Sequence, residues 1–311
     1  MTLIFFLGGL ALLYVGGEVF VRAAAALGKR LHMSPLVAGL TIVAFATSAP
    51  ELAISLSAAI DGLPGLAIGN VIGSNICNLA LILGIVTIIK PAPVRRTLAR
   101  RDVLVMLITT LLVPGLLLDG QLGRVEGTLL LLSMASYLVL TIWHARATRS
   151  DRRADEHSVP TITDSTLLNV GIAALGILLL VVGSRVFVDA SVTIAALIGV
   201  PTGVVGLSAA ALGSSLPELS ASIIAARHGQ PEMAAGNLIG SNIFNLLLIL
   251  GATSIVRPLA MESITTIDLT VMILVTVLAL ALMLTRARLG RREGIVLVSV
   301  YAVYMVWLYA Q

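Results

Sequence analysis

One block of this chain occurs twice. Residues 39–84 and 206–251 align without a gap at a shift of 167 residues, and 26 of the 46 aligned positions are identical. The identities include polar residues, and the shift brings Glu51 onto Glu218. Residues outside the block keep the same shift; they are Gly16 and Gly183, Pro91 and Pro258, Glu126 and Glu293, and Tyr137 and Tyr304. The chain is therefore predicted to fold as two related halves.

The composition predicts that most of the chain lies in lipid. Hydrophobic residues make up 58% of it and charged residues 12%, and the mean hydropathy is +1.04. An ordinary soluble domain has about 25% charged residues. A helix needs about 20 mostly apolar residues to cross a bilayer. We predict ten such spans, centred near residues 14, 46, 76, 110, 135, 180, 214, 244, 275 and 302. The predicted fold class is an all-α polytopic membrane protein.

Five spans in each half have a topological consequence. An odd number makes the second half enter the membrane from the opposite side, so the two five-helix repeats are predicted to be inverted. We place the first transmembrane repeat at residues 1–145, a cytoplasmic linker at 146–165 and the second repeat at 166–311.

Basic residues give the predicted orientation. They gather in the loops of one face, whereas the other face keeps little beyond Arg124 and Arg257. The positive-inside rule makes the basic face cytoplasmic and places both termini outside the cytoplasmic membrane. The formal net charge of +4 then reflects topology, and no nucleic-acid partner is needed to explain it.

The second and seventh predicted helices carry hydroxyls and a carboxylate on one face. Ala44, Thr47 and Glu51 follow the spacing i, i+3, i+7, with Ser48 beside them. The second copy is made of Ala211, Ser214, Ser215 and Glu218. A proline precedes each glutamate and should leave unpaired the carbonyl four residues back, that of Ala46 or of Gly213. Free carbonyl and carboxylate oxygens are ligands that hard cations prefer.

The third and eighth predicted helices add neutral oxygen donors. They are Asn70, Ser74 and Asn78 in the first copy and Asn237, Ser241 and Asn245 in the second. An ionised carboxylate at mid-bilayer costs at least about 2.5 kcal/mol. Two glutamates surrounded by such oxygens therefore predict a mid-membrane cation site, and a duplicated intramembrane carboxylate is typical of transporters.

These residues resemble the calcium/cation antiporter superfamily, specifically the prokaryotic sodium/calcium exchangers. That family carries a G-T-S-L-P-E-L core and a G-N-x-x-G-S-N-I-x-N core in each half. The first core corresponds here to ATSAPEL at 46–52 and GSSLPEL at 213–219. The second corresponds to GNVIGSNICN at 69–78 and GNLIGSNIFN at 236–245. The resemblance covers both halves of the chain.

The resemblance implies a metal site of named residues. Glu51 and Glu218 would bind Ca²⁺ directly, with Thr47 and Ser214 helping, and Asn78 and Asn245 would complete the centre. The implied peripheral Na⁺ sites use Ala44, Thr47, Ser48 and Ser74 in one half and Ala211, Ser214, Ser215 and Ser241 in the other. The family also slides its first and sixth helices across the other eight, which would place Gly16 and Gly183 at the sliding surface.

The sequence leaves the coupling ion open. Some exchangers have aspartate where this chain has Asn245, so the centre here holds two carboxylates, which balance one Ca²⁺ but not three Na⁺. The leading hypothesis is an antiporter that exchanges Ca²⁺ for Na⁺ by alternating access, with no prosthetic group. A Ca²⁺/H⁺ antiporter with the same glutamates as proton carriers is the alternative. A cation channel also needs carboxylates at a constriction, although inverted halves with broken helices favour a carrier. An intramembrane hydrolase lacks support, because no histidine lies near the mid-membrane serines.

Overall fold

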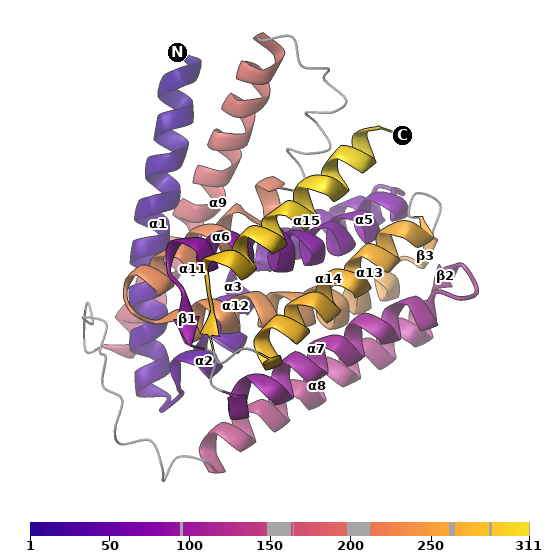
Figure 1. Ribbon diagram of the computed structural model, residues 1–311, viewed down its shortest axis with the longest axis horizontal. Coiled ribbons are helices and arrows are strands. Elements are labelled where there is room, and N and C mark those ends of the chain that lie inside the picture. Colours follow the sequence, from indigo (N-terminus) through magenta and orange to yellow (C-terminus); the bar gives the residue numbers. More distant parts are fainter. Residues whose placement is uncertain are drawn as a thin grey trace.

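The computed structural model describes residues 1–93, 96–147, 163, 165–197, 212–260, 265–285 and 288–310 (Figure 1). The α-helices of the first half are α1 (Thr2–Arg30), α2 (Pro35–Ala38), α3 (Ala44–Thr47), α4 (Ala49–Ile60), α5 (Pro64–Ile76), α6 (Leu83–Ile89), α7 (Arg96–Leu116) and α8 (Arg124–Ala147). Those of the second half are α9 (Thr166–Leu197), α11 (Leu216–Arg227), α12 (Pro231–Phe244), α13 (Leu250–Val256), α14 (Thr266–Thr285) and α15 (Arg291–Tyr309). Three segments are π-helical, namely η1 (Gly39–Val43), η2 (Cys77–Ile82) and η4 (Asn245–Ile249). The strands are β1 (Ala92–Pro93), β2 (Gln121–Leu122), β3 (Leu259–Ala260) and β4 (Arg288–Leu289).

The long helices have the length and composition of membrane spans. Six helical stretches in the described residues are apolar and long enough, and the bent pair Pro35–Thr47 and Ala49–Ile60 makes a seventh if counted as one span. Their outer faces expose large apolar side chains such as Val139, Leu167 and Val306. Such faces are costly in water and fit a lipid surround. Of the ten predicted spans, the one centred near residue 214 is described only from residue 212 onward.

Helices α1 and α9 form an antiparallel pair joined through glycines, and they lie side by side in Figure 1. A Cβ atom on Gly9 would lie 2.6 Å from the Phe187 nitrogen, and one on Gly16 would lie 2.8 Å from the Leu180 nitrogen. Only glycine permits such a close backbone approach. Gly183 faces α1 in the same way. Gly16 and Gly183 therefore join α1 to α9, whereas the family resemblance had implied a place where the pair slides over other helices.

Contacts between the halves come in pairs related by the 167-residue shift. Strand β1 pairs with β4, and β2 pairs with β3, both antiparallel. Arg124 donates from Nε to the Ile255 carbonyl at 3.1 Å, and Arg291 donates from Nε to the Ile88 carbonyl at 3.2 Å. Each half thus supplies two strands and an arginine to these contacts, and the halves interlock.

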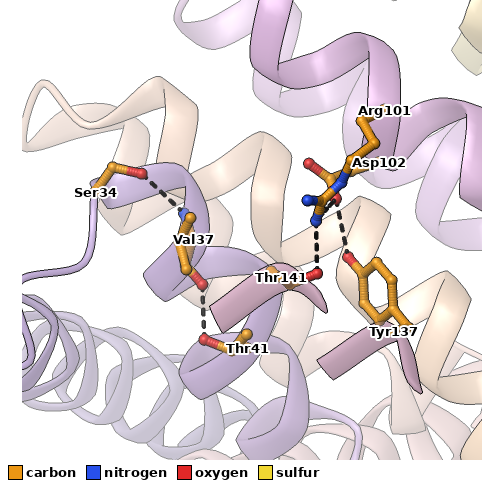
Figure 2. Close-up of polar contacts among 7 residues, drawn as sticks. All are labelled: Ser34, Val37, Thr41, Arg101, Asp102, Tyr137 and Thr141. Carbon is orange, nitrogen blue, oxygen red and sulfur yellow. Dashed lines mark hydrogen bonds and ion pairs between the residues drawn. The ribbon is translucent and has the colours of Figure 1, made fainter. Parts of the chain in front are cut away.

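A polar cluster ties α7 to α8 (Figure 2). The Arg101 guanidinium lies 3.1 Å from Asp102 Oδ1, and the Tyr137 hydroxyl donates to the same oxygen at 3.4 Å. In the second half the Tyr304 hydroxyl donates to Asp268 Oδ1 at 2.8 Å. Tyrosine–aspartate bonds therefore connect the equivalent helix pairs, α7 with α8 and α14 with α15.

The start of α2 follows from local sequence. Ser34 caps the helix by accepting a hydrogen bond from the Val37 amide at 3.3 Å, and Pro35 occupies the first helical position (Figure 2). The Thr41 hydroxyl donates to the Val37 carbonyl at 2.7 Å. Its hydroxyl is thereby satisfied within the helix, as a buried polar group requires.

Candidate metal centre

Two helix breaks place the glutamates at the centre of the molecule. The helical path is interrupted at Ser48 before α4 and at Ser215 before α11, in each case two residues ahead of the proline. Glu51 and Glu218 therefore lie in the first turns of α4 and α11, where the helix dipole favours a negative charge. Both side chains are fully buried, at 0% exposure. The breaks predicted at the two prolines are present.

Each glutamate is held by the serine of the other half. Ser48 Oγ donates to Glu218 Oε1 at 3.4 Å, and Ser215 Oγ donates to Glu51 Oε1 at 3.5 Å. These two bonds are equivalent under the 167-residue shift. The structure thus brings the two sequence motifs, far apart in the chain, into one centre with two carboxylates.

Asn70 and Asn237 organise the backbone around the carboxylates. Asn70 Nδ2 donates to Ser55 Oγ at 2.9 Å and to the Glu51 carbonyl at 3.3 Å. Asn237 Nδ2 donates to Ser222 Oγ at 3.0 Å, in the equivalent position. Because their amide nitrogens are engaged in this way, these asparagines fix the first turns of α4 and α11.

The amide oxygens of the same asparagines accept hydrogen bonds from across the molecule. Thr47 Oγ1 donates to Asn237 Oδ1 at 3.1 Å, and Ser214 Oγ donates to Asn70 Oδ1 at 3.4 Å. Thr47 Oγ1 also lies 3.1 Å from the Val43 carbonyl. These hydroxyls connect the second helix of one half to the third helix of the other.

Six further oxygens in the centre are buried and have no hydrogen-bond partner among the described residues. They form three pairs under the 167-residue shift, namely Glu51 and Glu218 Oε2, Ser74 and Ser241 Oγ, and Asn78 and Asn245 Oδ1. A buried polar atom without a partner costs about 1–3 kcal/mol. Carboxylate, hydroxyl and amide oxygens together are the donor set that Ca²⁺ and other hard cations prefer. The residues present therefore fit a hard cation.

The carbonyls predicted to be unpaired, those of Ala46 and Gly213, are both engaged. The Ala46 carbonyl accepts a backbone amide where α3 ends at Ser48. The Ala44 carbonyl accepts from the Ser48 amide at 3.0 Å and lies 3.5 Å from Thr47 Oγ1. The Gly213 carbonyl, predicted to be unpaired, accepts a short hydrogen bond from Ser184 on α9. That prediction was wrong because a residue from a distant helix fills the position. Ala211 lies outside the described residues.

The π-helical turns and one asparagine contact could not be found from the sequence pattern. Segments η2 and η4 begin at Cys77 and Asn245, beside the cation-ligand candidates, and π-helical turns are frequent at functional sites. Asn78 Nδ2 donates to Asn242 Oδ1 at 3.1 Å, and Asn242 Nδ2 donates to the Asn75 carbonyl at 3.3 Å. These bonds connect the two halves directly at the centre.

The centre holds few ionisable groups. Within the part of the chain that the structure describes, no three His, Cys, Asp or Glu side chains gather closely enough to hold a metal ion. The two glutamates are therefore supplemented by neutral oxygens. The side chain of Asn245 lies in this centre without a hydrogen-bond partner among the described residues.

Comparisons with known proteins give the family of the chain. The family model described as sodium/calcium exchanger protein matches residues 1–143 and 168–310. The chain is 36% identical to the putative antiporter CaxA of Alkalimonas amylolytica, over 99% of this chain and 98% of that protein. It is 31% identical to the sodium/calcium exchanger MaX1 of Methanosarcina acetivorans, over 97% of this chain and 96% of that protein.

Solved structures give the same result. The sodium-calcium exchanger NCX_Mj, soaked with 2.5 mM Na⁺ and 0.1 mM Ca²⁺, superimposes with a TM-score of 0.83 at 30% identity, over 98% of this chain and 97% of that one. The same exchanger soaked with zero Na⁺ and Ca²⁺ gives a TM-score of 0.84. These relatives are named as exchangers and antiporters, so the chain is a transporter and not an enzyme. Its long apolar helices are those of a multi-pass membrane protein. The chain belongs to the sodium/calcium exchanger protein family.

Proposed function

We propose that this protein exchanges Ca²⁺ for Na⁺ across the cytoplasmic membrane at the centre that contains Glu51 and Glu218. The observation that carries the proposal is the set of six buried, unpartnered oxygens, which occur in three pairs related by the duplication. Two ionised glutamates balance the charge of one Ca²⁺. Without a cation they would be poorly tolerated in the membrane.

Competition for the same oxygens couples the two ions. Hydroxyls near the glutamates come from Thr47, Ser48 and Ser74 and from their equivalents Ser214, Ser215 and Ser241. The backbone carbonyls come from Ala44 and Ala211. We infer that Na⁺ uses these oxygens in its own sites, so Ca²⁺ and Na⁺ cannot occupy the whole centre together. Alternating exposure of one shared centre then exchanges one ion for the other.

We further propose ten membrane-spanning helices in two inverted halves. The first half is residues 1–145, the second is 166–311, and the linker at 146–165 is cytoplasmic with both termini outside. The antiparallel packing of α1 on α9 supports inversion, because equivalent helices run in opposite directions. The paired contacts β1–β4 and β2–β3 support it as well.

Ca²⁺/H⁺ exchange is the second candidate, favoured by one observation. Asn245 is neutral, so the centre holds two carboxylates with a total charge of −2. Three Na⁺ would leave the centre with a net charge of +1, whereas two protons would neutralise the glutamates. The same centre would then release Ca²⁺ when both glutamates are protonated.

Transport assays in proteoliposomes separate these functions. Uptake of ⁴⁵Ca²⁺ is measured under a clamped membrane potential with an outward Na⁺ gradient or an outward H⁺ gradient. Uptake driven by Na⁺ supports the first proposal, and uptake driven only by H⁺ supports the second. Ca²⁺ flux that does not saturate and needs no counter-ion would contradict both.

Two variants test the site. Glu51→Gln and Glu218→Gln should each abolish exchange because one carboxylate charge is lost from the centre. Glu126→Gln, a glutamate in the first turn of α8, is the matched control and should transport normally. Uptake at the unsubstituted rate in either site variant would refute the assignment.

A further inference from the structure

The packing of α1 on α11 is tight and polar at one end of the molecule. A Cβ atom on Gly17 would lie 2.5 Å from Ser220 Oγ, so the two helices touch at this point. Ser220 Oγ donates to the Leu13 carbonyl at 2.6 Å. Further along, His228 Nε2 lies 2.9 Å from both carboxylate oxygens of Glu18. The contact between α1 and α11 therefore contains the Ser220–Leu13 hydrogen bond and, farther along, the Glu18–His228 couple, a carboxylate and an imidazole within hydrogen-bonding distance.

The Glu18 carboxylate serves two partners. It forms an ion pair with Arg22 one helical turn away on α1, and it accepts from His228, the residue that follows α11. The Arg22 bond lies within α1 and moves with it. Of these two bonds of Glu18, the one to His228 connects α1 to the end of α11.

The duplication places a second couple at the equivalent positions. The 167-residue shift carries Glu18 onto Arg185 of α9, and it carries Asp61, at the end of α4, onto His228. The signs of charge are exchanged, yet the positions remain complementary. Arg185 and Asp61 are both exposed, and no ion pair joins them among the described residues. Among the residues that the structure describes, Asp61 accepts a hydrogen bond from Ser57, at 3.3 Å.

The helix faces beside the two couples differ in burial. On α11, Ile224 is 3% exposed beneath α1. Its equivalent on α4, Ser57, is exposed, and so is Ala53, the equivalent of Ser220. Within the described residues, α9 has no packing on α4 comparable with that of α1 on α11. One of two equivalent contacts is thus made, and the other is open.

The two couples lie toward opposite ends of the molecule. Helix α11 runs in the same direction as α1, since Ser220 meets Leu13 and His228 meets Glu18. The stretch from α2 to α4 begins just after α1 ends and runs back, so Asp61 lies at the far end. Leu180 of α9 faces Gly16 of α1, and the two helices are antiparallel. Arg185, five residues after Leu180, therefore lies closer than Glu18 to the end of the molecule that holds Asp61.

We propose that Glu18–His228 and Asp61–Arg185 are reciprocal latches that hold the two end states of alternating access, and that only the first is closed in this structure. The inference rests on the proposed function as a transporter. The α1–α9 pair moves as one body, because glycine packing and the Arg30–Thr166 hydrogen bond of 2.8 Å hold it together. A shear of this pair along α4 and α11 opens one latch as it closes the other.

Cross-linking of paired cysteines tests the proposal. Glu18→Cys with His228→Cys reports the first latch, and Asp61→Cys with Arg185→Cys reports the second, each with a short bis-methanethiosulfonate in membranes. The native Cys77 is buried, at 1% exposure, and the four single variants control for its reaction. We expect both pairs to cross-link, with yields that change in opposite directions between Na⁺ and Ca²⁺ conditions.

Breaking one latch should favour the other. His228→Gln is expected to raise cross-linking at the Asp61–Arg185 pair by about two- to fivefold, the effect of losing one partly exposed ion pair. Arg227→Gln, the neighbouring charge change, is the matched control and should leave it unchanged. Failure of the Asp61–Arg185 pair to cross-link under every ion condition, while the Glu18–His228 pair does so, would overturn the proposal. An equal yield with and without His228→Gln would also overturn it.

A second measurement tests the proposal even if the double cysteine variants do not fold. Maleimide labelling of Ala53→Cys should be fast when the α4 face is open and slow when α9 covers it, and Arg185→Gln should keep it fast in all ion conditions. Labelling of Ala53→Cys that never slows in the otherwise unchanged protein would contradict the second latch. Cross-linking and labelling report helix positions whichever ion is carried, so failed Ca²⁺ transport and failed latching are distinguishable.

Discussion

Gly240 lies where α12 crosses η1 and α3, and its replacement by alanine should disturb the proposed cation centre. The new Cβ would lie 2.7 Å from Ala44 Cβ, 2.8 Å from the Leu40 carbonyl oxygen and 2.9 Å from Leu40 Cα. None of these atoms belongs to a flexible side chain. To reach an ordinary contact of 3.4 Å, the two segments must separate by about 0.6 Å.

The separation removes a hydrogen bond of the centre. Thr47 Oγ1 donates to Asn237 Oδ1 at 3.1 Å across the same crossing, one turn from Gly240. An added 0.6 Å lengthens it to about 3.7 Å, outside hydrogen-bonding range. Overpacking costs about 1–3 kcal/mol, a buried group left unpaired costs about 1–3 kcal/mol, and helix propensity returns about 0.5–1 kcal/mol. We expect Gly240→Ala to destabilise the protein by about 1–5 kcal/mol.

Thermal unfolding in detergent and ⁴⁵Ca²⁺ uptake measure the two consequences. Gly240→Ala should unfold at a midpoint lower by about 10 °C, and its Ca²⁺ uptake should need a higher Ca²⁺ concentration. Gly8→Ala is the matched control, because nothing lies within 4 Å of its added Cβ and the helix should gain up to about 1 kcal/mol. If the two variants share the same midpoint and uptake, the reasoning from close backbone approach is refuted.

Three further predictions follow from the centre and the α1–α9 pair. Asn245→Asp adds a third carboxylate beside buried oxygens and should change the Na⁺ dependence of uptake; an unchanged Na⁺ dependence would make the position peripheral. Ser48→Ala and Ser215→Ala each remove one hydrogen bond to a glutamate and should each weaken Ca²⁺ binding by about fivefold, measured by isothermal titration; unequal losses would contradict the equivalence of the two bonds. Gly9→Ala places a Cβ 2.6 Å from the Phe187 nitrogen and should lower the thermal midpoint, which size-exclusion after heating would detect; a normal midpoint would show that α1 and α9 can separate at little cost.

The features predicted correctly from the sequence are those that depend on neighbouring residues. Proline removes an amide donor, so breaks ahead of Pro50 and Pro217 follow from local chemistry alone. The duplication predicts that whatever surrounds Glu51 recurs around Glu218. The structure bears this out in the paired serine and asparagine bonds.

The features missed are those that depend on how distant segments meet. No local pattern says that Ser48 bonds the glutamate of the other half, or that Ser184 fills the Gly213 carbonyl. The π-helical turns η1, η2 and η4 contain one extra residue per turn, which a periodicity of 3.6 cannot reveal. Gly16 faces α9, and this orientation likewise depends on the angle at which the two helices pack.

The exchanged serine contacts have a consequence for how such a protein could have arisen. Since Ser48 reaches Glu218 and Ser215 reaches Glu51, neither half contains a finished site. If the halves are inverted, as proposed, a single-length ancestor would have needed two identical chains inserted in opposite orientations, each supplying a serine hydroxyl to the glutamate of the other. Fusion of the two copies removes the need for partners to meet. It also lets each half diverge, and the halves do differ at equivalent positions, with Glu18 against Arg185 and Asp61 against His228.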